Sequence, residues 1–372
     1  MFIFLHILFS CYNLSTKSIY QAQTQASTKL SDYDYDLPKG LIAQHPLENR
    51  DDARLLILHR DTGDIEHRKF SDITDYLLPN DLLILNNTKV LPARIFGHKS
   101  SGASVELLFV EDLGENQWKA LVKSNAKLRA SDEIYIDHHA VAALLQKRHD
   151  DGSWSIGFNG NSNIKEILHR IGEPPLPPYI KRQHSDARTP TDRERYQTVF
   201  AQKEGAIAAP TAGLHFSNTT LEKVRNLGVE LGFVTLHVGL GTFLPVKVED
   251  IRDHGMHKEY YECQEETYRK ITSARSQNRR IIATGSTSCR VLETIACDNK
   301  TPHTTGWTNL FIYPPYQFKS VDVLITNFHL PKTTLLILVS AFAGRENILH
   351  AYEAAKNEGY RFFSYGDCMM IV

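Results

Sequence analysis

Small residues gathered around a histidine are the first feature of this chain that could support chemistry. Residues 208–216 read Ala-Ala-Pro-Thr-Ala-Gly-Leu-His-Phe and contain Thr211, Gly213 and His215. Small side chains let a ligand approach the backbone, and a histidine can act as an acid, a base or a hydrogen-bond donor near neutral pH. A tight turn with a structural histidine gives the same pattern, and the pattern alone favours that simpler interpretation.

A second glycine motif follows the next strand candidate. Residues 237–243 read His-Val-Gly-Leu-Gly-Thr-Phe, with Gly239 and Gly241 at the carboxyl end of the strand, where α/β folds bind ligands. Leu244 replaces the third glycine of a dinucleotide fingerprint and no acidic ribose partner is evident. We therefore expect no nicotinamide cofactor, whereas the motif is compatible with an adenosine-type ligand. His237 is either a proton-transfer group or a core histidine.

A third motif combines hydroxyl groups with an arginine. Residues 280–290 predict a strand, a glycine turn and a helix start that contains Ser286, Thr287, Ser288 and Arg290. Free N–H groups at a helix start, together with an arginine in its first turn, suit a carboxylate or a phosphate. The P-loop lysine is missing, so this is not a P-loop. Ordinary helix capping explains the hydroxyl groups equally well.

Other charged and metal-binding patterns are weaker. His254 and His257, with Glu259 and Cys263 nearby, match neither a metalloprotease helix nor a zinc ribbon, and we expect no metal. The 42 basic and 43 acidic side chains give a net charge of -1, so any nucleic acid must be held by a local basic patch. Two stretches offer one, unless they are ordinary solvated surface: residues 118–129 with four cations, and residues 181–195 with a net charge of +2.

The elements that must position these residues predict an α/β fold. Residues 54–58 and 64–68 predict a hairpin around 61–63, residues 71–72 can cap a short helix, and residues 81–87 predict a buried strand. After residue 196, strands at 229–238, 280–284, 310–313 and 321–326 alternate with helices at 221–227, 265–277, 288–296, 334–341 and 348–356. This alternation predicts parallel βα units with helices outside the sheet.

A smaller domain interrupts this pattern. Strand candidates at 105–110, 118–122, 133–136 and 154–158, with few helical periods between them, predict a small antiparallel barrel or sandwich, followed by a short helix at 164–171. Prolines at 174–178 form a stiff connector. We thus expect an α/β domain built from both chain ends (29–91 and 173–372), with an antiparallel β-barrel domain (92–172) inserted in it.

Composition sets the class of protein. The chain has 372 residues, of which 42% are hydrophobic and 23% charged, as in globular enzymes. Its five cysteines are odd in number and contain no C-x-x-C pair, which predicts reduced cytosolic thiols. The apolar residues 1–9 are not preceded by Lys or Arg and are shorter than the ~20 residues of a membrane helix, so we expect neither a signal peptide nor a membrane span.

The order of the motifs along the chain is more informative about the family than any single motif. From Lys29 to its end, the chain resembles the S-adenosylmethionine:tRNA ribosyltransferase-isomerase family of queuosine biosynthesis. The resemblance rests on nine blocks, one of which reads Leu-Ile-Thr-Asn-Phe-His-Leu-Pro: residues 31–38, 83–94, 209–216, 237–243, 254–259, 285–290, 311–316, 324–331 and 360–367. The chain departs from the family at Leu240, Leu244 and Pro315, where Ala, Gln and Gly are usual. Residues 1–28 match nothing in the family, and a start codon assigned too early explains them most simply.

The resemblance implies an activity. Members of the family use S-adenosylmethionine as a ribosyl donor and as a co-substrate, with no further cofactor. The acceptor is 7-aminomethyl-7-deazaguanine in the tRNA wobble position, and the products are epoxyqueuosine, adenine and methionine. We therefore expect a cytoplasmic monomer whose partners are S-adenosylmethionine and tRNA. A methyltransferase using the same donor, a non-catalytic tRNA-binding protein and a zinc hydrolase are the rival interpretations.

This chemistry suggests a role for each of the residues singled out above. The sulfonium acidifies the adjoining 5′ carbon, so the reaction needs a base near neutral pH and an acid for the departing adenine. The candidates for proton transfer are His215, His237 and His329, with Asp367 as an orienting group or alternative base. Arg290 and the turn at 286–288 are candidates for binding the methionine carboxylate. Thr211, Gly213, Gly239 and Gly241 are candidates for the remainder of the substrate site.

Overall fold

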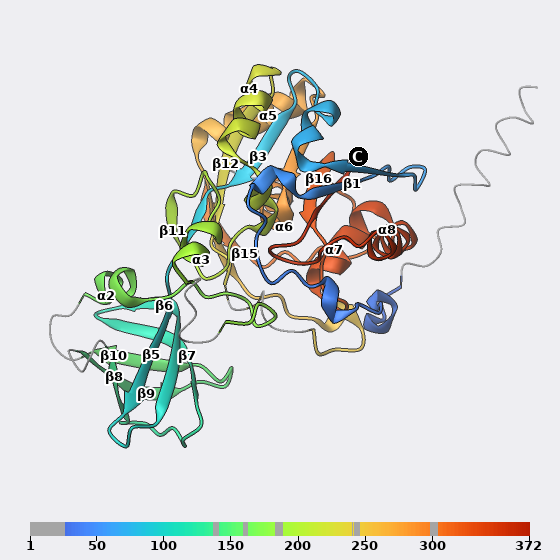
Figure 1. Ribbon diagram of the computed structural model, residues 1–372. Coiled ribbons are helices and arrows are strands. Elements are labelled where there is room, and N and C mark those ends of the chain that lie inside the picture. The colour runs from blue at the N-terminus through green and yellow to red at the C-terminus, as the bar shows by residue number, and fades with distance from the viewer. Residues whose placement is uncertain are drawn as a thin grey trace, which may run out of the picture.

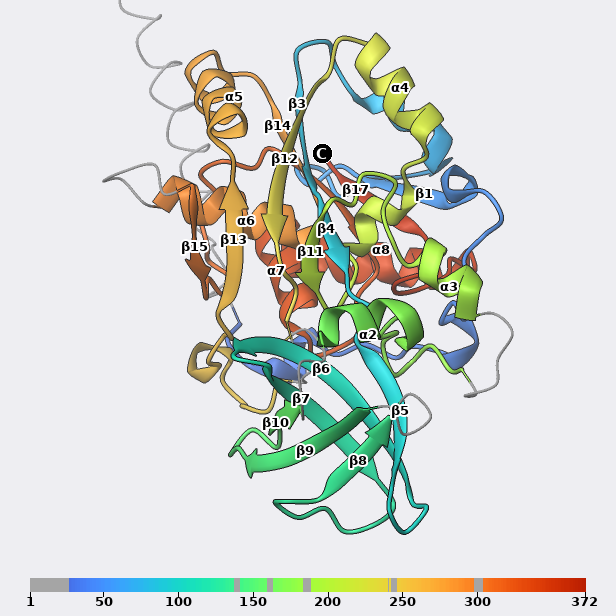
Figure 2. The same cartoon turned by 90° about the vertical axis from the view of Figure 1, so that its left-hand side faces the viewer.

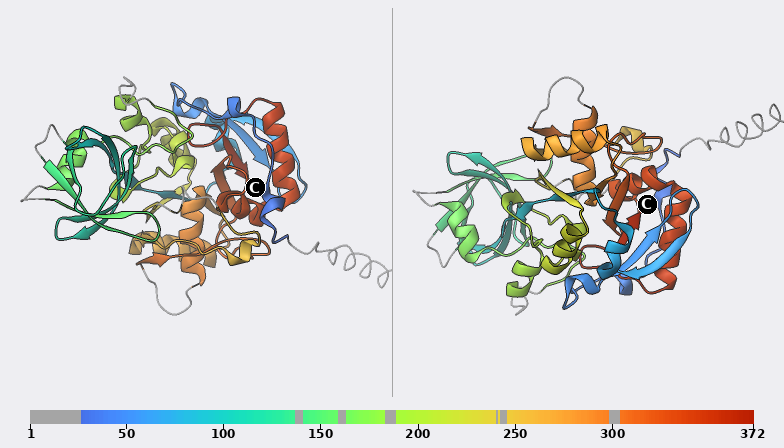
Figure 3. Two further views of the ribbon diagram at one scale, coloured as in Figure 1. Left: turned by 90° about the horizontal axis from the view of Figure 1, so that it is seen from below. Right: turned by 90° about the horizontal axis from the view of Figure 1, so that it is seen from above.

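The computed structural model describes residues 27–136, 141–158, 163–182, 189–239, 241, 246–297 and 304–372. The apolar start of the chain, Leu240 and Leu244 lie outside these residues. The predicted fold class is confirmed: a mixed sheet with helices on its faces carries a closed six-stranded antiparallel barrel (Figures 1 and 2). The barrel lies at one end of the molecule in both views of Figure 3.

Both ends of the chain contribute to one nine-stranded sheet. In spatial order its strands are β15 (Thr305–Thr308), β13 (Glu259–Cys263), β12 (Glu230–Leu236), β3 (Leu82–Asn86), β14 (Ile281–Thr284), β16 (Val323–Asn327), β17 (Cys368–Ile371), β1 (Arg54–Leu58) and β2 (Ile65–Lys69). The predicted hairpin of β1 and β2 is confirmed, with Gly63 at a φ of 81° in its turn. The last strand, β17, pairs with β1 in parallel, which joins the two chain ends.

The prediction of parallel βα units is right only for part of the sheet. The pairs β12–β3, β3–β14, β14–β16 and β17–β1 are parallel, whereas β15–β13, β13–β12, β16–β17 and β1–β2 are antiparallel. The reversal at β17 follows from the helices before it. A single crossover helix carries the chain back to the edge of the sheet at which the preceding strand began, so the next strand is parallel to it. Here two helices, α7 (Thr334–Ala343) and α8 (Arg345–Asn357), follow β16 in succession. They return the chain to the edge at which β16 ended, so β17 runs antiparallel to β16.

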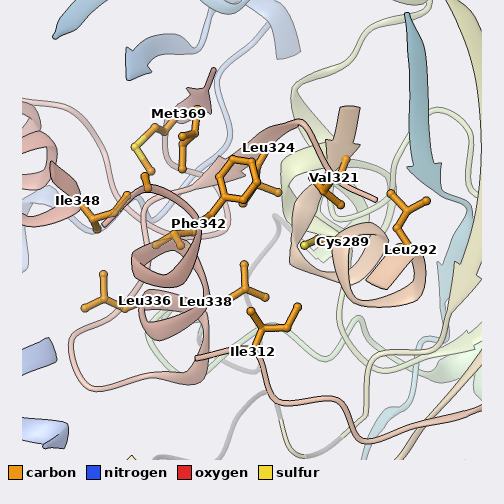
Figure 4. Close-up of a cluster of buried hydrophobic side chains, with 14 of the residues drawn as sticks. Cys289, Leu292, Ile312, Val321, Leu324, Leu336, Leu338, Phe342, Ile348 and Met369 are labelled. Carbon is orange, nitrogen blue, oxygen red and sulfur yellow. The ribbon is translucent and has the colours of Figure 1, made fainter. Parts of the chain in front are cut away.

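Helices cover both faces of the sheet and bury its apolar residues. On one face, α5 (Glu265–Ser276), α6 (Gly285–Cys297), α7 and α8 pack into a single core, part of which is drawn in Figure 4. On the other face, α4 (Asn218–Asn226) and the 3-10 helix η4 (Phe70–Tyr76) cover a second core. Side-chain caps from Ser217 and Thr333 begin α4 and α7. Each fully buried Leu, Ile or Phe contributes about 1.5–3 kcal/mol to these cores.

The barrel consists of β5 (Arg94–Lys99), β6 (Ser104–Gly114), β7 (Gln117–Ser124), β8 (Glu133–Ile136), β9 (Val141–Arg148) and β10 (Trp154–Phe158). Four of these strands were predicted, but β5 and β9 were not. In β5, Gly97 interrupts the strand-forming pattern of the sequence. A glycine is needed at this position, since a Cβ there would lie 2.6 Å from the Tyr135 carbonyl oxygen. Helix α2 (Ile164–Ile171) has the predicted bounds and buries Ile164, Ile167 and Leu168 against the barrel.

The connections between sheet and barrel run through short elements. Strand β4 (Thr88–Val90) leads into the barrel and pairs in parallel with β11 (Lys203–Ala206), and α3 (Thr189–Arg195) lies between the proline connector and β11. The domain boundaries at 92 and 172 remain a prediction. Among the described residues, no helix combines the length and apolar character needed to cross a membrane.

Candidate active site

An open cavity lies where β14 and β16 end, and its empty space, including solvent at the mouth, is about 1230 Å³. Chain segments that are distant in sequence converge on it, and both strands run in parallel, so that their carboxyl ends meet at one edge of the sheet. Its lining comes from residues 177, 179, 196, 208–212, 238, 256, 259, 285–287, 290, 310–312, 326–330, 333–335, 338 and 363–364.

The start of α6 forms one wall of the cavity. Strand β14 ends at Thr284 and the helix begins at once with Gly285, whose φ of 84° makes the turn possible. The sequence predicted this helix from Ser288, and its earlier start places Ser286 and Thr287 in the first turn, facing the cavity. The N–H groups of a first helical turn have no partner within the helix, so they are available to an anion.

The hydroxyl groups of this turn differ in their surroundings. The Oγ atoms of Thr287 and Ser288 are buried and have no hydrogen-bond partner among the described residues. Thr287 lines the cavity, whereas Ser288 is fully buried and does not. Of the predicted hydroxyl groups, those of Ser286 and Thr287 are therefore the ones placed to meet a ligand.

Arg290 lies one turn further along α6 and also lines the cavity. It is buried and paired with the carboxylate of Glu259, and its Nε donates to the Leu310 carbonyl at 3.0 Å. Its Nη2 has no hydrogen-bond partner in the described part of the chain. A buried guanidinium nitrogen without a partner costs free energy, which a ligand carboxylate would recover.

Glu259 is the main polar residue of the site that the sequence did not identify as a substrate-binding residue. One carboxylate oxygen pairs with Arg290, and the other accepts a hydrogen bond from the Gly239 N–H at 3.0 Å. Glu259 thereby connects α6 to the glycine loop after β12. The sequence marked it only as a member of an unconvincing metal pattern, because its partners come from distant parts of the chain.

His329 is the predicted proton-transfer residue that lines the cavity. Its Nε2 forms a hydrogen bond of 2.8 Å with the Thr326 hydroxyl, and its backbone N–H donates to the Tyr352 hydroxyl. Burial lowers the pKa of His329 to about 3. The imidazole is therefore neutral at pH 7 and can form hydrogen bonds, but it is a weak proton acceptor.

His215 lies behind the cavity wall. The Asn327 amide, which does line the cavity, donates to its Nε2 at 3.1 Å. Burial, and secondarily the nearby Arg361, lower the pKa of His215 to about 3. In the same motif Thr211 lines the cavity, whereas Gly213 packs so closely that a Cβ would lie 2.9 Å from Phe200 and Thr198. Packing is thus sufficient to explain that glycine.

His237 also lies outside the lining, although the next residue, Val238, is part of it. Its Nδ1 forms a 2.8 Å hydrogen bond with the Thr88 hydroxyl, and burial lowers its pKa. Neither Gly239 nor Gly241 lines the cavity, and a Cβ on Gly241 would lie 2.8 Å from the His257 ring. The predicted roles of these two glycines in substrate binding therefore have no direct contact with the cavity to support them.

Asp367 is buried and holds the backbone. Its Oδ1 accepts from the Arg54 N–H at 3.1 Å and its Oδ2 from the Arg361 N–H at 2.7 Å. These contacts fix the start of β1 beside the segment that leads into β17. Asp367 does not line the cavity, so its predicted role as an orienting group or base has no direct contact to support it.

The apolar wall of the cavity was not predicted as such. Phe311, Ile312, Leu335 and Leu338 form part of it. The sequence predicted a strand at 310–313, which is wrong: these residues form a loop, and the strand β15 ends at Thr308. The two prolines that follow, 314 and 315, were the feature of the sequence that argued against a strand here, since proline is disfavoured within strands.

The described residues contain no group of three or more potential metal-binding side chains. His254 and His257, which the sequence considered for zinc, turn to different neighbours. The ring of His254 lies 5.2 Å from that of Phe311, and the ring of His257 packs on Gly241.

The two basic stretches differ in how much charge they leave available. In the second, Arg182 is paired with Asp192, and Arg193 and Arg195 donate to backbone carbonyl groups. In the first, Lys119 pairs with Asp151, but the remaining cations are exposed on the barrel: Lys123, Lys127 and Arg129. The barrel stretch is therefore the better candidate for contacting a phosphate backbone.

Comparison with known proteins identifies the family. The sequence profile of the family described as "Queuosine biosynthesis protein" matches residues 30–371. The S-adenosylmethionine:tRNA ribosyltransferase-isomerases of Staphylococcus aureus strains JH9 and Newman are each 48% identical over 345 residues, which cover 92% of this chain and 99% of the relative. The crystal structure of the S-adenosylmethionine tRNA ribosyltransferase from Thermotoga maritima has 38% identity and a TM-score of 0.53, and the match covers 92% of this chain and 100% of that one. The chain therefore belongs to the queuosine biosynthesis protein family.

Proposed function

We propose that this protein transfers and isomerises the ribosyl moiety of S-adenosylmethionine onto 7-aminomethyl-7-deazaguanine in the tRNA wobble position. The products are epoxyqueuosine, adenine and methionine. The observation that carries the proposal is the near full-length identity to S-adenosylmethionine:tRNA ribosyltransferase-isomerases, at 48% over 99% of the relative. The convergence of the loops at 208–212, 285–290 and 326–330 on one cavity supports it.

The cavity offers complementary surfaces for the parts of S-adenosylmethionine. The methionine carboxylate fits the first turn of α6, where it would meet the N–H groups near Ser286 and Thr287 and the unpartnered Nη2 of Arg290. The apolar wall that includes Phe311 and Leu338 suits the adenine ring. S-adenosylmethionine is a co-substrate in this proposal, and no further cofactor is required.

Proton transfer is the step in which the histidines would act. The reaction needs a base beside the 5′ carbon and a hydrogen-bond donor for the departing adenine. His329 is the histidine placed to contact substrate, and its neutral imidazole suits hydrogen bonding to the adenine or the ribose better than removal of a proton. His215 would act through Asn327, as a positioning residue.

The acceptor must also reach the cavity. A tRNA base must leave its stack before it can meet a bound co-substrate. The cavity is open to solvent at its mouth, and we infer that the flipped base enters there. Because the acceptor is tRNA, we expect the enzyme to act in the cytoplasm, and we expect it to act as a monomer.

One experiment distinguishes this function from its rivals. The purified protein is incubated with S-adenosylmethionine and tRNA that carries the deazaguanine precursor, and the digested nucleosides and the released bases are analysed by mass spectrometry. The proposal requires epoxyqueuosine and an equal amount of free adenine. S-adenosylhomocysteine without adenine would indicate a methyltransferase, and tRNA binding without a changed nucleoside would indicate a binding protein.

A further inference from the structure

Three aromatic rings form a row across the edge of the sheet next to the cavity. The row consists of His237 at the end of β12, Tyr260 on β13 and Trp307 on β15. The His237 and Tyr260 rings are stacked with centroids 6.1 Å apart and planes 19° apart, and the Tyr260 and Trp307 rings meet edge-on at 5.6 Å. The strand register fixes this order, because Tyr260 pairs directly with Trp307 and its carbonyl accepts from the His237 N–H.

The row becomes more exposed toward the edge of the sheet. His237 is covered by β4 and β11, through its hydrogen bond to Thr88 and its close contact with Gly205. Figure 2 shows these two strands beside the end of β12, with β13 and β15 continuing outward from it. Tyr260 is half-buried, and Trp307 is 63% exposed, more than any other large hydrophobic residue among those the structure describes.

The row lies next to the cavity lining in sequence. Val238 follows His237 and lines the cavity, and Glu259 precedes Tyr260 and lines it too. Consecutive residues of a strand point to opposite faces, so Tyr260 and Glu259 lie back to back at the start of β13. The row and the pair of Glu259 with Arg290 therefore lie at the same end of β13, on its two faces.

A single exposed tryptophan needs no special explanation, but a row of three rings near the cavity does. Aromatic rings on a protein surface are the platform on which unpaired bases stack, whichever base is present. Lys258, which directly precedes β13, is exposed and has no ion-pair partner among the described residues, so a cation for the RNA backbone lies beside the row. An aliphatic patch would have suited a protein partner better than this combination of rings and positive charge.

We propose that His237, Tyr260 and Trp307 form a stacking platform for the unpaired anticodon-loop bases that flank the modified nucleotide. This inference rests on the proposed function, because it takes tRNA as the substrate. Stacking the neighbouring bases outside the cavity would hold the loop open while the wobble base is inside, and it would offset part of the unstacking cost of flipping that base.

The experiment measures tRNA use by variants of Trp307. Trp307→Ala raises the KM for tRNA by roughly 5- to 150-fold, the range expected when one stacked base is lost, and leaves the KM for S-adenosylmethionine unchanged. Trp307→Tyr restores most of the affinity because it keeps a π-face, whereas Trp307→Leu does not. Leu78→Ala removes another exposed apolar side chain, from the turn before β3, and serves as the matched control without effect.

Fluorescence gives a second readout that does not depend on catalysis. The chain has three tryptophans, and Trp118 and Trp154 are each only 5% exposed within the barrel. An anticodon stem-loop RNA should therefore quench the emission of Trp307 selectively, and Trp307→Phe should abolish that quenching while the barrel emission remains.

The outcomes separate this inference from the proposed function. A wild-type protein that forms no epoxyqueuosine contradicts the function, and the RNA quenching still tests the platform. An active wild type whose Trp307→Ala variant keeps its KM for tRNA overturns the platform alone. The platform is also overturned if Trp307→Leu behaves as wild type, or if the wild type is a dimer that Trp307→Ala dissociates, since the face would then bind protein.

Discussion

The ion pair between Glu259 and Arg290 allows a quantitative test of the carboxylate site. The perturbation is Glu259→Gln, which keeps the shape of the side chain and an acceptor for the Gly239 N–H but removes the negative charge. The two side chains are 5% and 6% exposed, so water screens the remaining guanidinium charge very little. Leaving one partner of a buried pair uncompensated costs about 3–5 kcal/mol. Because the amide can still accept hydrogen bonds, we take the lower end and expect about 3 kcal/mol.

The ligand should offset part of the stability that Glu259→Gln loses. In the proposed site S-adenosylmethionine brings a carboxylate to Arg290, and in Glu259→Gln the described residues offer the guanidinium no other anionic partner. The ligand should therefore stabilise the variant more than the wild type, by about 1.4 kcal/mol for each tenfold difference in affinity. The assay is urea unfolding of both proteins, each measured with and without S-adenosylmethionine at one fixed concentration.

Two further variants control this reasoning. In Glu259→Gln/Arg290→Met the uncompensated charge is gone, so the double variant should be more stable than Glu259→Gln alone. Asp81→Asn breaks the pair of the buried Asp81 with the partly exposed Arg280, at the starts of β3 and β14 and away from the cavity, and should lower stability without changing the response to ligand. The carboxylate assignment is refuted if S-adenosylmethionine stabilises Glu259→Gln no more than the wild type.

Further predictions concern the ligand, the pH and metal ions. The wild type should prefer S-adenosylmethionine to its decarboxylated analogue by roughly tenfold or more, and Arg290→Met should reduce this preference to what the N–H groups of α6 supply; equal binding of the two ligands by the wild type would contradict the site. The folded-state pKa values of His215 and His329 lie near 3, below the ~6.5 of an unfolded histidine, so the unfolded chain gains protons first as the pH falls below 6.5. Each histidine then costs about 2 kcal/mol of stability at pH 5, and urea unfolding of His329→Asn at pH 7 and pH 5 should show a smaller loss than the wild type. Chelators should leave adenine release unchanged, and a loss of activity that added zinc restores would contradict this expectation.

The sequence by itself was enough for the fold class and the family. Short strands separated by turns predicted the barrel, the Asp-Thr-Gly turn predicted the β1–β2 hairpin, and the apolar residues at helical spacing predicted the helix α2. These features depend on local propensity and on alternation along the chain, which neighbouring residues determine. The order of nine motifs likewise predicted the family that the comparisons identify.

Tertiary structure decided which of the marked residues reach the cavity. Three histidines had the same standing in the sequence, yet His329 faces the cavity, His215 lies behind Asn327, and His237 is held by Thr88 at its border. The pairing of Arg290 with Glu259 joins residues 31 positions apart on different elements. Burial, pKa and side-chain direction arise from contacts between distant segments, and a linear pattern does not contain those contacts.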